Sequence, residues 1–235
     1  MCERRDINKI IMASAPRFLV LDCGSITNPD ATADMAALTA AMGAATETDA
    51  KRGMDKAWAA SRANADMDAV RYWTVALTEA GVAAEQVDTA AIERCEACVH
   101  RVLSGTFQET IDAAASRKAE GKVMVGVISN HITSPPWFQV CAEAAKLYEL
   151  ASDPSLVVVS QEAGVSKPDP AIFKLFMEKL RALEPAAREE EVLFVDDKEK
   201  NVSAAVALGW QGLVFNAATA TPGAFATALA QRYGL

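Results

Sequence analysis

The chain has 235 residues, enough for one large domain or for a core with a smaller insert. Hydrophobic residues make up 51% of it and can fill a sizeable core, while the net charge of -8 argues against nucleic-acid binding, which usually needs a basic face. No apolar run reaches the roughly 18 residues that predict a membrane-spanning helix, so we expect no membrane partner.

The first sixteen residues mix charged side chains with a short apolar cluster and lack the long apolar stretch of a secretory signal. We therefore predict an N-terminal extension. Five cysteines are an odd number, which favours free thiols and a reducing, cytoplasmic location. Cys95 and Cys98 form a C-x-x-C pair without a second ligand pair, so helix packing is a better interpretation than a zinc site.

The first predicted strand, Phe18–Leu21, is a short apolar run that places Asp22 at its carboxyl end. Asn28, Pro29 and Asp30 then mark a loop. The next seventy residues are rich in Ala, Met, Leu and Glu and show no convincing strand pattern, which predicts a helical insert. The predicted division is an extension at residues 1–16, a core at 17–30 and 103–235, and a helical cap at 31–102.

Strands and helices alternate in the rest of the chain. Thr106 to Glu109 has the form of a capping box and predicts a helix that ends at Gly121. The further predicted elements are strands at 123–128, 156–160, 192–195 and 213–215, and helices at 135–150, from Asp169 onward, and up to Gly209. This alternation predicts an α/β fold, a Rossmann-like three-layer core with a mainly parallel sheet, to which the helical cap is added.

Polar side chains follow the predicted strands at the edge where parallel sheets bind ligands. These residues are Asp22, Ser129 with Asn130, Lys167, and Asp196 with Asp197. Taken alone, each of these residues is more often part of a turn, a helix cap or a charge on the surface. Their order and spacing, each at a strand end or in a nearby loop, are what predict a site.

The chemistry of these groups suits a phosphate ester. Adjacent acids such as Asp196 and Asp197 repel each other and favour a bound cation, and oxygen ligands suit Mg²⁺. Lys167 can neutralise phosphate and keep Asp22 ionised. Ser129 and the backbone N–H of Asn130 can donate to phosphate oxygens. The sum predicts covalent catalysis by a carboxylate on phosphorus.

In order and type, the four elements resemble the motifs of the haloacid-dehalogenase superfamily. They are FLVLDCGSIT (18–27), VISN (127–130), SKPDP (166–170) and VDDKEKN (195–201). The resemblance spans about residues 17–216, and the helical insert falls where that superfamily places its first cap type. Within the superfamily, the chain resembles the branch of bacterial α-glucose-1-phosphate phosphatases and epoxide-hydrolase phosphatase domains.

The resemblance implies a role for each residue in hydrolysis of a small phosphorylated metabolite, such as a sugar phosphate. Asp22 attacks phosphorus and forms an aspartyl-phosphate, which water then hydrolyses. Magnesium is held by Asp22, the carbonyl of Gly24 and the acidic pair, Asp197 being the first choice and Asp196 the second. The phosphate is held by Ser129, Asn130 and Lys167, and Arg62 on the insert is a candidate substrate-facing residue.

Gly24 departs from the family pattern. Phosphatases of the superfamily mostly carry a second Asp at this position, which protonates the leaving group and later activates water. General acid–base catalysis is typically worth ~10²–10⁴-fold, so its loss matters. The α-glucose-1-phosphate branch nevertheless includes members with Asp-x-Gly. His131, directly after Asn130, is one hypothesis for a substitute acid.

Two other functions stay open. A dehalogenase would use Asp22 on carbon, but dehalogenases of the superfamily carry an arginine soon after the nucleophile, and here none follows until Arg52. The chain could also be a non-catalytic relative that binds a phosphorylated ligand or a protein partner. This function would explain why Gly24 stands in place of the second Asp.

Overall fold

The computed structural model describes residues 15–63 and 67–235, except the side chains of residues 62 and 63. Its centre is one sheet of five parallel strands in the order β3-β2-β1-β4-β5. The strands are β1 (Phe18–Leu21), β2 (Met124–Ser129), β3 (Val157–Val159), β4 (Val192–Asp196) and β5 (Gln211–Val214). The predicted parallel α/β sheet is therefore confirmed, and β1, which carries Asp22, lies in its middle.

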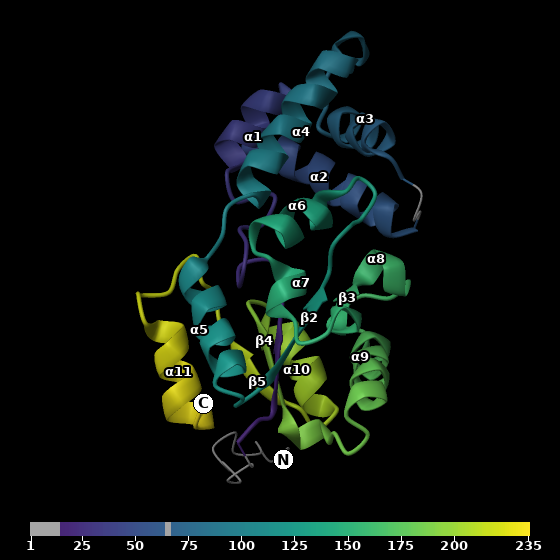
Figure 1. Cartoon of the computed structure of the whole chain (residues 1–235). Coiled ribbons are helices and arrows are strands. Elements are labelled where there is room, and N and C mark those ends of the chain that lie inside the picture. Colours follow the sequence, from purple (N-terminus) through teal and green to yellow (C-terminus); the bar gives the residue numbers. More distant parts are fainter. Residues whose placement is uncertain (1–14, 64–66) are drawn as a thin grey trace, which may run out of the picture.

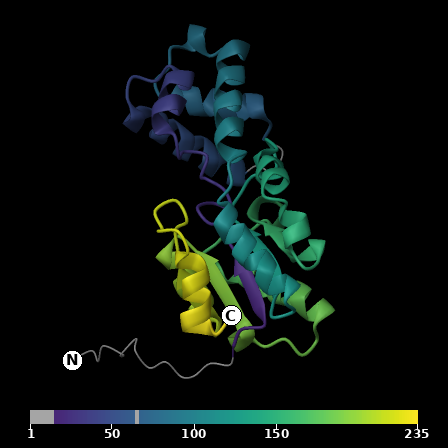
Figure 2. The same cartoon turned by 60° about the vertical axis from the view of Figure 1, so that its left-hand side comes forward.

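Helices cover both faces of the sheet because its buried side chains alternate between them. Leu19 and Leu21 pack in one cluster with residues of α5 (Gln108–Ala119) and α11 (Ala224–Tyr233). Phe18 and Val20 pack in a second cluster with residues of α9 (Pro170–Leu183) and α10 (Glu199–Ala207). Figure 2 brings α11 and α5 forward, in front of the sheet, and the result is the predicted three-layer core.

Residues 35–103 form a helical segment without strands among its described residues. Its helices are α1 (Met35–Met42), α2 (Glu47–Ala63), α3 (Ala69–Glu79), the 3-10 turn η1 (Ala84–Gln86) and α4 (Thr89–Leu103). The side chains of Asp34, Asp68 and Asp88 cap the N-termini of α1, α3 and α4. Each accepts a hydrogen bond from the backbone N–H of the residue three positions later. These helices gather at one end of the molecule, away from the layers around the sheet (Figure 1).

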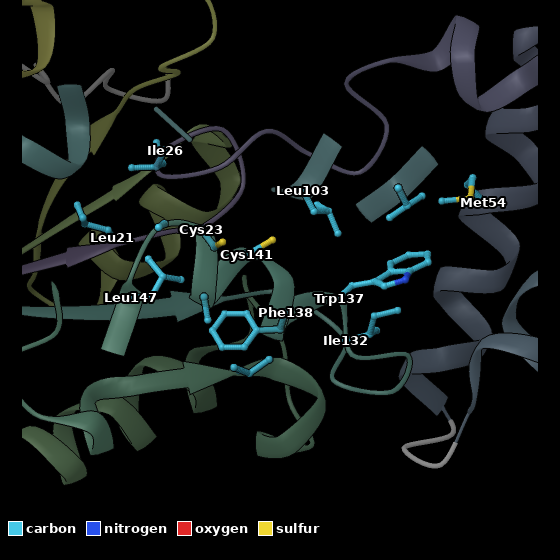
Figure 3. Packing of buried hydrophobic residues seen from close by; sticks show 14 of the residues in the cluster. Leu21, Cys23, Ile26, Met54, Leu103, Ile132, Trp137, Phe138, Cys141 and Leu147 are labelled. Atoms are coloured by element: carbon cyan, nitrogen blue, oxygen red, sulfur yellow. The ribbon is translucent and has the colours of Figure 1, made fainter. Parts of the chain in front are cut away.

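One buried cluster runs from the sheet into the helical segment. Figure 3 shows it from Leu21 and Cys23 through Cys141 and Trp137 to Met54 of α2. Trp137 begins α6 (Trp137–Ala144), and its indole N–H donates to Glu96 of α4, 3.1 Å away. Trp73 of α3 donates to the same carboxylate. The helical segment is therefore packed onto the rest of the chain and not merely tethered to it.

Two predicted elements differ from the structure, and one helix was missed. Thr106 is not an N-cap: α5 begins at Gln108, and Glu109 accepts from the backbone N–H of Gly223 instead of closing a capping box. The single helix expected at 135–150 is two, α6 and α7 (Leu147–Leu150), because Lys146 adopts a left-handed conformation (φ 49°). The C-terminal helix α11 was not predicted, since its alanine-rich sequence has no clear apolar face.

Two remaining expectations concern cysteines and membranes. Cys95 is buried and Cys98 half-buried on α4, consistent with helix packing, and the four cysteines that the structure describes are all free. Among the described helices, none is both long and apolar enough to cross a bilayer.

Candidate active site

The parallel strands bring the predicted polar residues to one edge of the sheet. Leu21 of β1 is in register with Val195 of β4, so the next residues, Asp22 and Asp196, are neighbours. The backbone N–H of Asp22 donates to the carbonyl of Val195 over 2.9 Å, which fixes the start of the loop. β2 ends beside β1 at Ser129, which is buried.

Lys167 joins these strands through its ammonium group. The Nζ atom lies 2.6 Å from Asp22 Oδ1 and 2.7 Å from Asp196 Oδ2. It also donates to the carbonyl of Ile128, 2.7 Å away. The side chain is fully buried, and a buried cation is stable only with such close partners. Three of the predicted residues therefore meet at one point.

The side-chain amide of Asn130 holds Lys167 in place. Asn130 Nδ2 donates to the carbonyl of Lys167, and the backbone N–H of Lys167 donates to Asn130 Oδ1, both over 2.8 Å. This two-way contact fixes the loop that delivers the ammonium group. The sequence predicts that the backbone N–H of Asn130 donates to phosphate, and the side-chain contacts with Lys167 leave that prediction standing. Its side chain positions Lys167.

Asp22, Asp196 and Asp197 form a cluster in which one oxygen of each lies within 4.8 Å of the others. Asp196 is already saturated, since it accepts from Lys167, from the backbone N–H of Lys198 and from Asn201. Asp197 Oδ1, in contrast, is buried and accepts no hydrogen bond. A buried carboxylate oxygen without a donor fits a cation ligand, so the residues present suit Mg²⁺.

Burial shapes the protonation of this cluster. It raises the pKa of Asp22 to about 7, although the Lys167 ammonium opposes the shift. Burial also raises the pKa of Asp197, against the pull of Lys198, and the carboxylates of Asp30 and Asp196 add to the rise. A divalent cation would offset the mutual repulsion of these acids.

A pocket of about 550 Å³ opens above the cluster. Asp22, Gly24 and Asn130 line it from the sheet side, and Lys51 and Trp58 of α2 line it from the helical segment. This volume suits a small metabolite. Arg62 also belongs to α2, but its side chain lies outside the described residues, so its expected role stays a prediction.

His131 lies at the pocket but its ring is engaged. Its Nδ1 accepts from the backbone N–H of Ile132 at 3.0 Å, and its Nε2 lies 3.7 Å from Cys141 Sγ. The contact of Cys141 with Cys23, aided by His131 and opposed by burial, lowers the pKa of Cys141 to about 6. Figure 3 shows the side chains of Cys23 and Cys141 in the same part of the buried cluster. Both ring nitrogens of His131 therefore have contacts, and its role as a substitute acid stays a prediction.

Sequence reasoning did not select several pocket residues. Two of them, Asp30 and Lys198, are charged and lie close enough to influence Asp197. A third, Lys51, lines the pocket from α2. The sequence does place Lys198 directly after the acidic pair. Asp30 was interpreted only as part of a loop, and Lys51 has no local signal at all, because only the packing of α2 brings it to the pocket.

A family model described as hydrolase, haloacid dehalogenase-like hydrolase, matches residues 11–209. No curated protein sequence matches the chain.

Solved structures share the fold at low sequence identity. A dehalogenase with an intermediate complex is 16% identical with a TM-score of 0.60, covering 90% of this chain and 89% of that one. The HAD family enzyme bt-2542 from Bacteroides thetaiotaomicron, in complex with magnesium and inorganic phosphate, is 17% identical with a TM-score of 0.61, at 87% and 96% coverage. L-2-haloacid dehalogenase from Xanthobacter autotrophicus is 18% identical with a TM-score of 0.58, at 84% and 76% coverage.

Proposed function

From the membership of the chain in the haloacid dehalogenase-like hydrolase family, we propose that it is a magnesium-dependent phosphatase acting on a small phosphorylated metabolite. The observation that carries the proposal is the buried Oδ1 of Asp197 near Asp22, which accepts no hydrogen bond and has the Lys198 ammonium group 3.8 Å away. A reaction on carbon without a metal gives this oxygen no use. A solved neighbour that holds both magnesium and phosphate has the same fold.

Asp22 is the proposed nucleophile. One carboxylate oxygen attacks phosphorus, the bond from phosphorus to the ester oxygen breaks, and an aspartyl-phosphate forms. Water then attacks this phosphorus, and the bond to Asp22 breaks. Lys167 keeps Asp22 ionised, and together with Ser129 and the backbone of Asn130 it meets the negative oxygens of the phosphate.

The proposed Mg²⁺ ligands are Asp22, the carbonyl of Gly24 and Asp197, with Asp196 as second choice because its oxygens already have donors. When bound, the ion screens the charges of the nucleophile and the phosphate from one another.

We further propose that residues 31–102 act as a cap over the core of 17–30 and 103–235. Lys51 and Trp58 of α2, which line the pocket opposite Asp22, support this division. A sugar phosphate fits a pocket that combines these two side chains. The free cysteines favour a cytoplasmic location.

The test is phosphate release from a panel of phosphorylated metabolites, with and without Mg²⁺. We expect release from wild type with Mg²⁺, loss of it with EDTA, and loss of it in Asp22→Asn, which keeps the size of the side chain. Chloride release from 2-haloacids without metal would instead support the dehalogenase alternative, toward which two of the solved neighbours point. Binding of phosphorylated ligands without turnover would support the non-catalytic alternative.

A further inference from the structure

The position of the missing second acid is not empty. Gly24 has no side chain, but a Cβ atom built on it would overlap Oδ1 of Asp30. The two nearest atoms that such a Cβ would meet both belong to the Asp30 carboxylate. The glycine therefore leaves a space that a carboxylate from six residues further along the chain fills.

Ser25 orients this carboxylate. Its Oγ donates to Asp30 Oδ2 over 3.2 Å, which leaves Oδ1 on the side of Gly24. Ser25 has a φ of 60°, a left-handed conformation that is costly for a residue with a Cβ. Hydrogen bonds within the loop hold this conformation. The backbone N–H groups of Ile26, Thr27 and Asn28 all donate to the carbonyl of Cys23. A glycine would avoid the cost but would lose the hydroxyl group.

Asp30 shares the pocket with the nucleophile. It is half-buried and lines the same cavity as Asp22 and Asn130. Lys198 lines this cavity as well. The Asp30 carboxylate therefore borders the space in which a substrate beside Asp22 would lie.

We propose that Asp30 is the acid and base of the reaction, in place of a carboxylate at position 24. The inference rests on the proposed phosphatase function. In the first step Asp30 begins as the carboxylic acid. As Asp22 attacks phosphorus, the electron pair of the breaking P–O bond moves to the leaving oxygen, which takes the proton of this acid and leaves Asp30 as a carboxylate. The Asp30 carboxylate then takes a proton from the water that attacks the aspartyl-phosphate, which restores both residues.

The test compares leaving groups in Asp30→Asn. An alkyl phosphate needs a proton on its leaving oxygen, whereas p-nitrophenyl phosphate leaves as a stable anion. We expect kcat for the alkyl phosphate to fall by ~10²–10⁴-fold. With p-nitrophenyl phosphate we expect a burst of one nitrophenolate per active site and then slow turnover, because only the water step still lacks its base.

Gly24→Ala provides a second variant with the same expected result. Its methyl group would meet only Asp30 among side-chain and backbone atoms nearby, so it displaces the carboxylate without touching Lys167 or Asp197. The double substitution Gly24→Asp/Asp30→Ala returns a carboxylate to this space from the other position, and we expect it to recover alkyl phosphate turnover. Asp112→Asn, an exposed residue on α5, is the matched control and should behave as wild type.

The outcomes separate the two proposals. Unchanged alkyl phosphate turnover in both Asp30→Asn and Gly24→Ala overturns the role of Asp30 and leaves the phosphatase proposal intact. Loss of the thermal stabilisation by Mg²⁺ in Asp30→Asn would make Asp30 a metal ligand and also overturns the role. Absence of Asp22-dependent phosphate release in wild type overturns the phosphatase function, and the inference with it.

Discussion

Lys167 and Lys51 form ion pairs of equal length in opposite surroundings. Lys167 Nζ lies 2.6 Å from Asp22 Oδ1 with its side chain fully buried, whereas Lys51 Nζ lies 2.6 Å from Asp55 Oδ2 with 63% of its side chain exposed. Removing one partner of a buried pair leaves an uncompensated buried charge. We therefore expect Lys167→Met to lower the free energy of unfolding by ~3–5 kcal/mol without Mg²⁺.

Urea unfolding followed by circular dichroism checks this prediction, with Lys51→Met as the matched control. The control should change little, because water already solvates both members of the exposed pair. Equal losses in the two variants would contradict the view that burial makes the Lys167 pair important.

At the scale of single residues, the sequence predicted the groups whose position follows from the strands. Asp22, Asp196 and Asp197 meet because parallel strands end at one edge, and strand ends can be located from apolar runs. The Asn130 amide and Asp30 were not assigned their contacts, because these depend on how two loops bend. A left-handed serine and a carboxylate above a glycine leave no periodic pattern in the sequence.

At the scale of elements, the five strands were predictable and several helix boundaries were not. Each strand is a short apolar run next to turn residues, and the observed strands lie within a few residues of the predicted ones. The false capping box at Thr106 shows why local motifs are weaker evidence. Phe107 donates its backbone N–H to Thr27, a residue 80 positions earlier, and this long-range contact sets where α5 begins.

Gly126 in β2 tests how tightly the sheet packs against α9. A Cβ atom at this position would lie 2.5 Å from Phe176 Cζ and 3.2 Å from the carbonyl oxygen of Leu156. Phe176 cannot easily yield, since it is buried against Trp210 with ring centroids 5.9 Å apart. We expect Gly126→Ala to lower the free energy of unfolding by ~1–3 kcal/mol through overpacking.

A double-mutant cycle with Phe176→Leu identifies the cause. The smaller side chain makes room for the new methyl group, so the double variant should lose less stability than the sum of the two single variants. Additive losses would show that the methyl group acts through the backbone of β2 and not through the ring.

At the scale of the whole molecule, the pocket lies where the sheet and the helical segment share one buried cluster. Met54 of α2 and Trp137 of α6 belong to both this cluster and the pocket wall. A ligand that holds Asp22 and Asp197 together joins the ends of two core strands, β1 and β4, at the floor of this pocket. Binding to the folded state alone stabilises it against unfolding.

Mg²⁺ should raise the thermal midpoint of wild type by this linkage. At a concentration one hundred times the Kd, the gain is ~2.7 kcal/mol, or roughly 5–10 °C for a chain of this size. EDTA should reverse the increase. We expect Asp197→Asn to abolish it while leaving the midpoint without metal near or above that of wild type, because the neutral amide removes a buried negative charge that Asp30 and Asp196 repel.

Two further variants decide which acid of the pair binds the metal. Asp196→Asn should lower the midpoint both with and without Mg²⁺, because Lys167 then loses the partner 2.7 Å from its ammonium group. Asp112→Asn should keep the full increase, since Asp112 is exposed on α5. Differential scanning fluorimetry over a Mg²⁺ titration measures the thermal midpoints of wild type and of each variant. An undiminished increase in Asp197→Asn would contradict the assignment, because the buried carboxylate oxygen of Asp197 that lacks a donor would then have no part in holding the ion.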